Sequence, residues 1–304
     1  MKLFTHLLKY GATTLVGLVG LGVAANSAQA FSVTPTDDGQ GLVQKILGSG
    51  ISVVPGSVTY SGASGTSGIF TGGLSTGIGI DSGIILTTGQ AIDALGPNDL
   101  DNTTTQNGEP GDADLDGLIP GFSTLDALTL EFDFISTGGD LFFNYVFASE
   151  EYNEFVNSSF NDVFGFFLDG QNIALIPGTT TPVAINTVNK DVNSALFNDN
   201  DRSDVGVPTP FDIEYDGFTS IFTAQALGLT PGQHRIKLAI ADAGDFNLDS
   251  AVFIQANSFS DTPTEAIPEP ISVLGTLAAG AFGANFMRKR KQKQAALDTV
   301  KVKA

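Results

Sequence analysis

Short runs of β-branched and aromatic residues recur through the middle of the chain, and clusters of Gly, Pro, Asn and Asp separate them. This spacing is typical of strands joined by tight turns. In the clearest run, 128–135, Leu and Phe alternate with Thr, Glu and Asp, which predicts a strand with one buried face. Helical periodicity is scarce, and we expect one short helix at 40–47.

The same pattern predicts further strands, two of which are joined by a Thr-Gly-Gly-Asp turn at 137–140. The predicted strands are 51–60, 128–135, 141–148, 163–168, 173–176, 183–188, 218–224, 235–241 and 251–256. A Gly-, Ser- and Thr-rich stretch at 61–79 is compatible with a loop or with an edge strand. Many short strands without alternating long helices predict an all-β fold, a β-sandwich or jelly-roll-like single domain.

The charge of the chain is strongly negative and unevenly placed. The 304 residues hold 14 Lys and Arg against 33 Asp and Glu, and the segment 31–270 holds only five of the basic residues but 32 of the acidic ones. Such a segment repels phosphate, so we expect no nucleic acid as a partner. There is no Cys and there are only two His, which excludes disulfides, thiolate metal sites and multi-histidine metal sites. The 23 Phe are most simply core residues.

The N-terminus has the three parts of a secretory signal peptide, which we place at 1–30. Lys2 and Lys9 supply positive charge, an apolar stretch covers 14–25, and Ala28-Gln29-Ala30 is a cleavage sequence of small residues. The mature chain would then start near Phe31. The alternative is an uncleaved membrane anchor.

The C-terminus also has three parts. Pro268-Glu269-Pro270 precedes an uncharged run at 271–287, and the basic cluster 288–291 follows. This order resembles the PEP-CTERM sorting signal (268–291) of Gram-negative bacteria. The resemblance implies an exosortase-type processing enzyme as a partner and a protein released or re-anchored outside the cytoplasmic membrane. We expect 271–287 to form a transmembrane helix, with 292–304 as a cytoplasmic tail and 258–267 as a polar linker before the signal. The alternative is an ordinary single-pass anchor.

A long aromatic and acidic block between 143 and 167 resembles the choice-of-anchor L domain. The other matching blocks are 74–89, 111–115, 172–178, 213–219 and 237–245. The resemblance spans about 40–257, within a domain that we place at 31–257. It implies a secreted or surface-attached bacterial β domain with no established catalytic activity.

Three acidic clusters are candidate calcium sites, since Ca²⁺ takes six to eight oxygen ligands. The first is Asp112, Asp114 and Asp116 before Gly117, whose alternating carboxylates could converge on one ion. It is not an EF-hand, because Ser123 stands where the twelfth-position Glu is needed. Further ligands for this loop could come from Asp99, Asp101 or Glu109. The alternative is a solvated acidic loop.

The second cluster is Asp242, Asp245 and Asp249, between two predicted strands, and the third is Glu150, Glu151 and Asp162. Five basic residues cannot neutralise 32 carboxylates, so metal ions or exposure to water must do so. We therefore expect Ca²⁺ as a cofactor at one or more of these clusters. The alternative is turn capping by Asn and Asp together with exposed charge.

Candidate catalytic residues are few. His234 follows a turn and no G-x-S-x-G elbow is present, so a Ser-His-Asp triad is not expected. We predict a non-enzymatic, exported structural or adhesive protein of the cell surface or extracellular matrix, with envelope or matrix polysaccharide as a candidate partner. One alternative is a carbohydrate-binding module. Another is a secreted glycoside hydrolase with Glu150 or Glu151 as acid and Asp162 as base.

Overall fold

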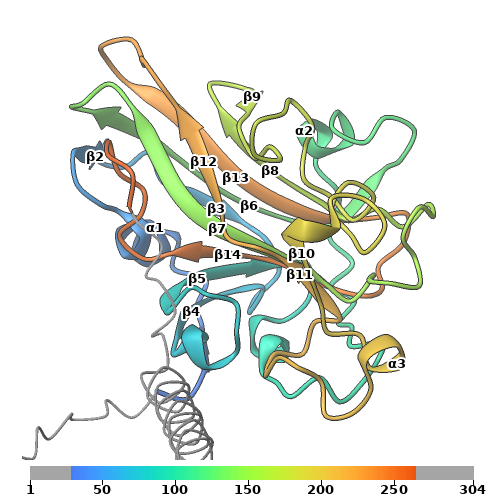
Figure 1. The fold of residues 1–304 in the computed structure, drawn as a ribbon. Coiled ribbons are helices and arrows are strands. Elements are labelled where there is room, and N and C mark those ends of the chain that lie inside the picture. The colour runs from blue at the N-terminus through green and yellow to red at the C-terminus, as the bar shows by residue number, and fades with distance from the viewer. Residues whose placement is uncertain (1–28, 265–304) are drawn as a thin grey trace, which may run out of the picture.

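Two antiparallel sheets packed face to face form the core of the protein (Figure 1). The computed structural model describes residues 29–264, and fourteen strands lie in this part of the chain. The two-layer arrangement agrees with the predicted all-β sandwich. The expected signal peptide and the expected C-terminal sorting signal lie outside the described residues, apart from residues 29 and 30. No helix in 29–264 has the length and apolar character needed to cross a membrane.

The larger sheet has eight strands. Seven follow the order β1-β4-β5-β14-β7-β11-β10, and β12 pairs with β7. Their bounds are β1 Ser32–Pro35, β4 Ser67–Thr71, β5 Ser82–Thr87, β7 Leu141–Ser149, β10 Phe197–Asp199, β11 Gly217–Thr219, β12 Phe222–Ala226 and β14 Ser250–Gln255. β7 lies between β14 and the pair β11 and β12, so all nine of its residues are buried.

The smaller sheet has six strands in the order β2-β6-β13-β8-β9, and β3 pairs with β6. Their bounds are β2 Ile51–Val53, β3 Thr59–Ser61, β6 Thr124–Ser136, β8 Val163–Leu168, β9 Gln171–Asn172 and β13 His234–Ala243. β6 keeps a regular alternation of buried and half-buried positions over most of its length. This is the period-2 pattern that the sequence shows at 128–135.

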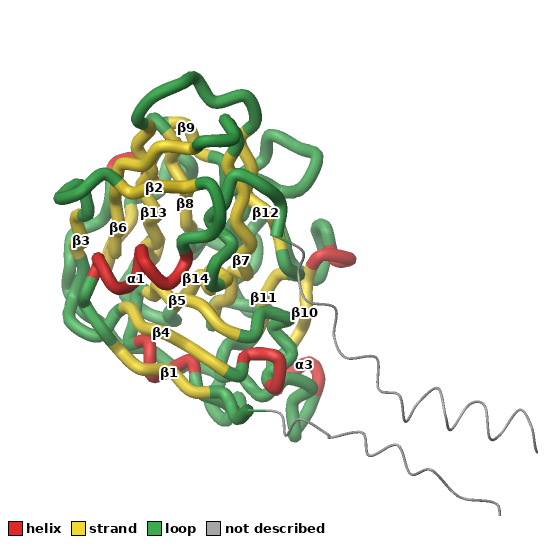
Figure 2. Tube along the Cα trace, turned by 90° about the vertical axis from the view of Figure 1, so that its left-hand side faces the viewer, coloured by secondary structure: helices red, strands yellow, loops and turns green. Residues whose placement is uncertain are grey.

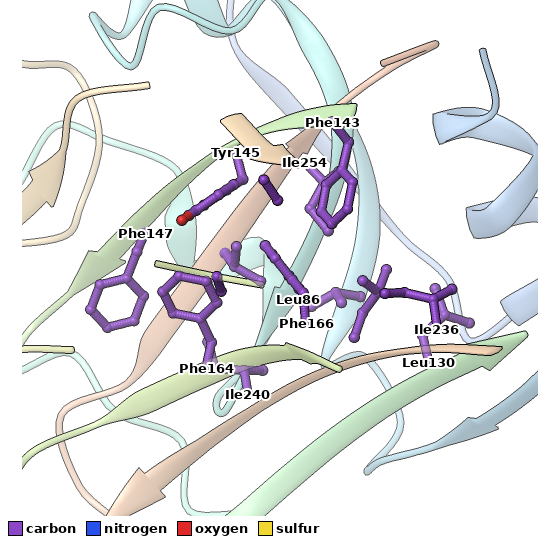
Figure 3. Packing of buried hydrophobic residues seen from close by; sticks show 14 of the residues in the cluster. Leu86, Leu130, Phe143, Tyr145, Phe147, Phe164, Phe166, Ile236, Ile240 and Ile254 are labelled. Atoms are coloured by element: carbon purple, nitrogen blue, oxygen red, sulfur yellow. The ribbon is translucent and has the colours of Figure 1, made fainter. Parts of the chain in front are cut away.

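The core lies between the two sheets and is rich in aromatic residues. Figure 3 shows Phe143, Tyr145 and Phe147 of β7 facing Phe164 and Phe166 of β8. The Tyr145 and Phe166 ring centroids are 5.0 Å apart in an edge-to-face arrangement. Such contacts add to the stabilisation that burial of apolar area already provides. The Phe excess in the composition is therefore explained largely by this core.

Three α-helices and three short 3-10 segments complete the fold. The α-helices are α1 Gly39–Ile46, α2 Ala113–Asp116 and α3 Arg202–Val205, and the 3-10 segments are η1 Gly73–Ser75, η2 Ala91–Ala94 and η3 Ser194–Leu196. α1, drawn as a red coil in Figure 2, is the helix predicted at 40–47. It buries Leu42, Val43 and Ile46 in the core.

Several predicted strands differ from the observed ones. The segments 173–176 and 183–188 are buried but make only isolated bridges, at Leu175–Pro182 and Val163–Ala184. Their apolar runs reflect burial, and Pro182 supplies no N–H for a ladder. β5 was not predicted as a strand, because its run of buried residues lacks alternation. The Gly-rich stretch 61–79 contains β4, a strand rather than only a loop.

The domain continues past residue 257, where we expected the linker to begin. Phe259 is fully buried, and its ring lies 5.2 Å from those of Phe132, Phe134 and Phe143. Ser260 exchanges backbone hydrogen bonds with Phe142 at 2.8 and 3.0 Å. Residues 258–260 therefore belong to the sandwich. The burial of Phe259 and the hydrogen bonds of Ser260 hold this segment against the core, although most of its neighbours in the chain are polar.

Candidate functional site at the acidic end of the sandwich

The antiparallel pairing brings acidic residues from distant parts of the chain to one end of the sandwich. β7 and β13 end there, while β8, β11 and β14 begin there, as the pairs Ser149–Ser250, Ser149–Gly217 and Val163–Ala241 show. This end lies on the side of α2 and α3 in Figure 1. The acidic residues at or next to these strand ends are Glu150, Glu151, Asp162, Asp216, Asp242 and Asp249. We call these six residues the acidic end.

All six side chains of the acidic end are buried. None of the six residues exposes more than 2% of its surface. The ion pairs found among residues 29–264 involve other acids, such as Asp204 with Lys190 and Glu131 with Arg235. A buried carboxylate without a cation is costly, because the protein interior solvates charge poorly. These groups therefore need protons or a bound cation.

Hydrogen bonds satisfy only part of the acidic end. Asp162 accepts from the Ala243 N–H at 2.9 Å and from the Ser250 hydroxyl at 2.7 Å, and Asp249 accepts from the Thr105 N–H at 2.9 Å. By contrast, six buried oxygens have no hydrogen-bond partner. They are both carboxyl oxygens of Glu150 and of Asp242, Oε2 of Glu151 and Oδ2 of Asp216.

Burial raises the pKa of every one of these carboxyl groups. Burial is the largest cause, and neighbouring carboxylates add to it. The pKa of Asp162 rises to about 7, those of Asp216 and Asp249 rise to about 8, and that of Glu151 rises to about 10. The pKa values of Glu150 and Asp242 also lie well above their ordinary range.

The arrangement offers two chemical states. In the first, several carboxyl groups remain protonated at neutral pH. In the second, some of them ionise and bind a cation through carboxylate oxygens, the donor type that Ca²⁺ prefers, although no three of the six have oxygens within 4.8 Å of one another in this structure. Because the groups are almost inaccessible to solvent, an extended sugar cannot reach Glu150, Glu151 or Asp162 in this conformation. The burial of these three residues therefore disfavours the glycoside hydrolase alternative.

The predicted cluster Asp112, Asp114 and Asp116 lies elsewhere, at α2 beside the outer face of the smaller sheet. Asp112 caps α2 by accepting from the Asp114 and Leu115 N–H groups, and Asp116 accepts from Thr124 at 2.7 and 2.8 Å. The Lys237 ammonium group lies 2.5 Å from Asp112 and 2.8 Å from Asp114. Lysine thus already supplies a positive charge here, the role assigned to calcium in the sequence interpretation.

The other predicted acids are divided between the acidic end and its margin. Glu150, Glu151, Asp162, Asp242 and Asp249, from two separate predicted clusters, meet at the acidic end. Asp245 is half-buried in the loop after β13 and raises the pKa values of Glu151 and Asp162. In the sequence, these acids form two separate clusters because each cluster contains only residues close together in the chain. The pairing of the strands brings the two clusters to the same end of the sandwich.

His234, the one His among the described residues, follows a turn and is buried. It is 7% exposed, its Nδ1 lies 2.6 Å from Asp169 Oδ2, and its Nε2 lies 2.8 Å from the Thr230 carbonyl. The hydrogen bond to Asp169 is the main reason why its pKa is raised. Both ring nitrogens are engaged, so this His ties the β12–β13 turn to the β8–β9 turn.

The structure also brings together three aspartates that the sequence analysis did not group. Carboxylate oxygens of Asp101, Asp201 and Asp216 lie within 4.8 Å of one another, the closest metal-compatible triad among the described residues. Asp101 was considered only as an extra ligand for the loop at 112–116. A usable sequence signal for Asp216 was its place just before the predicted strand 218–224. The positions of Asp101 and Asp201 depend on loop folding.

Fold and site together define a class, an acid-rich β-sandwich with few and short helices whose buried carboxyl groups collect at one end. His234, the one His among the described residues, is not part of a catalytic triad, because its ring nitrogens contact Asp169 and the Thr230 carbonyl. The sequence profile of the Choice-of-anchor L domain matches residues 32–260, so the chain belongs to this family. The family is one of surface-associated domains and is not known as an enzyme family. Searches of curated proteins and of solved structures gave no significant match.

Proposed function

We propose that the protein is an exported structural or adhesive component of the cell surface or extracellular matrix, and that Ca²⁺ bound at the acidic end stabilises it. Family membership supports the surface association. The expected signal peptide and PEP-CTERM signal support export and processing by an exosortase-type enzyme. Matrix or envelope polysaccharide is the partner class that we propose for the adhesive role.

The observation that carries the calcium proposal is the set of unpartnered buried oxygens. Glu150 and Asp242 each expose 1% of their surface, and none of their carboxyl oxygens has a hydrogen-bond partner in good geometry, although the Thr103 backbone lies near Glu150 and the Thr88 side chain lies near Asp242. Buried polar atoms in folded proteins nearly always have partners, so such atoms need an explanation. A divalent cation supplies both the missing contacts and the missing positive charge.

Thermal melting of the purified protein at pH 8 tests the calcium proposal. An ion that binds only the folded state stabilises it by about 2.7 kcal/mol when its concentration is 100 times its dissociation constant. For a domain of this size we therefore expect EDTA to lower the Tm by at least about 5 °C and excess Ca²⁺ to restore it. Mg²⁺ at equal concentration is the control for ionic strength. Equal melting in EDTA and in Ca²⁺ would remove calcium from the proposal.

Export and adhesion need separate measurements. Mass spectrometry of the protein recovered from the envelope and from the medium should show a start near Phe31 and the loss of 271–287. Finding the intact chain in the cytosol would contradict export. A glycan array probed with and without Ca²⁺ tests binding to polysaccharide and also the carbohydrate-binding alternative.

A further inference from the structure

We infer that Asp101, Asp201 and Asp216 form a second calcium site at the margin of the acidic end, with which it shares Asp216, and that this site fastens two surface loops to the larger sheet. This inference goes beyond the proposed function, because it assigns a site and a role to a triad of residues that neither the sequence nor the family groups together. Asp101 lies in the loop between η2 and α2, Asp201 is the N-cap of α3, and Asp216 directly precedes β11.

The spacing of the three carboxylates fits one ion. Because their oxygens are no more than 4.8 Å apart, a single point lies within about 2.8 Å of all three, close to the 2.3–2.6 Å of Ca²⁺–oxygen contacts. Asp201 and Asp216 are buried, at 1% and 0% exposure, whereas Asp101 is exposed. The ion would thus lie between two buried carboxylates and one exposed carboxylate, and water on its exposed side would complete its coordination shell.

Asn98 provides an observation that is independent of the acids. It is 3% exposed, and its Nδ2 donates to Asp216 Oδ1 at 2.7 Å and to the Asn200 carbonyl at 3.0 Å. These two acceptors fix the orientation of the amide. Its Oδ1 is then left buried without a donor, and so is Oδ2 of Asp216. A cation would satisfy both oxygens, whereas a buried water would satisfy them without supplying charge.

The local charge balance also favours a divalent ion. Arg202 Nη1 lies 3.7 Å from Asp101 Oδ1 and donates to the Asp99 carbonyl, so one positive charge accompanies the three carboxylates. A net charge of about −2 remains, which one Ca²⁺ neutralises. Exposed Glu154 helps to raise the pKa of Asp216, so its carboxylate adds to the negative charge around the triad.

Such a site would control the contact between the 98–105 loop and α3. Without the ion, three carboxylates from three separate segments repel one another across the contact between the 98–105 loop and α3. With the ion, the same groups hold that contact together. The loop containing Asp101 also carries the Thr105 N–H that binds Asp249 at the acidic end. Calcium at this site would therefore hold this loop over the acidic end.

Isothermal titration calorimetry of the chelator-stripped full-length protein with Ca²⁺ tests this inference. Asp101→Asn is the decisive variant, because Asp101 is exposed and its loss leaves the core intact. Asp114→Asn is its matched control, since Asp114 is also an exposed carboxylate beside one cation. We expect D101N to weaken one calcium site at least tenfold and D216N to abolish it, while D114N titrates like the unchanged protein.

The outcomes separate this inference from the proposed function. If the protein binds Ca²⁺ and D101N titrates like D114N, the second site is wrong while calcium at the strand ends stands. If Ca²⁺ binding is lost only in Asp242→Asn, the same conclusion holds. If the unchanged protein binds no Ca²⁺, both fail, and the Asn98 oxygen is satisfied by water. Should D216N not fold, D101N alone decides.

Limited trypsin digestion gives an independent readout at the same place. Arg202 directly follows Asp201 and is the first residue of α3, so cleavage after Arg202 reports on the order of this segment. We expect Ca²⁺ to slow this cleavage at least tenfold in the unchanged protein and in the control D114N, and D101N to remove this protection. Equal protection by Ca²⁺ in D101N and in D114N would overturn the inference.

Discussion

Protons and calcium should compete for the acidic end, and this competition predicts an unusual dependence of stability on pH. In the absence of metal, we expect the free energy of unfolding to fall as the pH rises from 5 to 8. The buried carboxyl groups have higher pKa values in the folded state than in the unfolded chain. The folded state therefore holds more protons than the unfolded chain in this range, and its advantage is lost as the pH approaches the folded pKa.

The magnitude follows from the individual groups. For Asp216 or Asp249, whose pKa rises from 3.8 to about 8, the linkage relation gives about 3–4 kcal/mol of stability lost per group between pH 5 and 8. Structural relaxation and coupling among neighbours will reduce the sum. A total loss of about 4 kcal/mol corresponds to a fall in Tm of about 10 °C for a domain of this size.

Differential scanning calorimetry in EDTA, at constant ionic strength between pH 5 and 8, measures this fall. In 5 mM Ca²⁺ we expect the Tm to stay level or to rise over the same range, because calcium binds the ionised form. His234 has a raised pKa and contributes a loss of the same sign, so His234→Gln is the control and should retain most of the fall. A metal-free Tm that rises from pH 5 to 8 would refute the reasoning.

Four substitutions extend the test. Asp242→Asn, which removes a buried charge without changing shape, should raise the metal-free Tm at pH 8 and reduce the gain from Ca²⁺; an unchanged calcium gain would count against its role as a ligand. Gly89→Ala should weaken calcium-dependent stabilisation, since a Cβ there would lie 1.6 Å from the carboxylate of Asp249. Phe259→Ala should cost about 3–5 kcal/mol in urea unfolding, whereas a cost near zero would place it outside the core. Lys237→Gln should cost about 1 kcal/mol in the same assay, because Asp112 loses its charged partner, and no loss would show that pair to be unimportant.

The strands with regular alternation could be predicted from the sequence because each has one face in the core. β6 alternates buried and half-buried residues over most of its length. β8 is buried throughout, but clear turns mark both of its ends. β5 could not be recognised as a strand by alternation, because buried residues follow one another along it. The core role of Phe259 was hidden in a polar run, since a single apolar residue has no periodicity.

The candidate site was predictable in kind but not in arrangement. The excess of 32 acids over five bases in 31–270 already required cations or exposure. The sequence could not show that Asp162 and Asp242 lie next to each other, because their proximity depends on the pairing of β8 with β13. It also could not show that Lys237 reaches Asp112, which lies 125 residues away in the chain. Adjacent carboxylates in the sequence therefore suggested a calcium loop where the fold has an ion pair and helix caps.

The central claim is that ionised carboxylates at this end of the sandwich are neutralised by calcium. Equilibrium dialysis of the chelator-stripped protein against radioactive Ca²⁺ at pH 7.5 counts bound ions directly. We predict at least one ion per chain held at micromolar free Ca²⁺, with fewer ions bound at pH 5 as protons replace them. Fewer than 0.1 ions per chain at millimolar Ca²⁺ would contradict the account and leave protons as the means by which these carboxyl groups are neutralised.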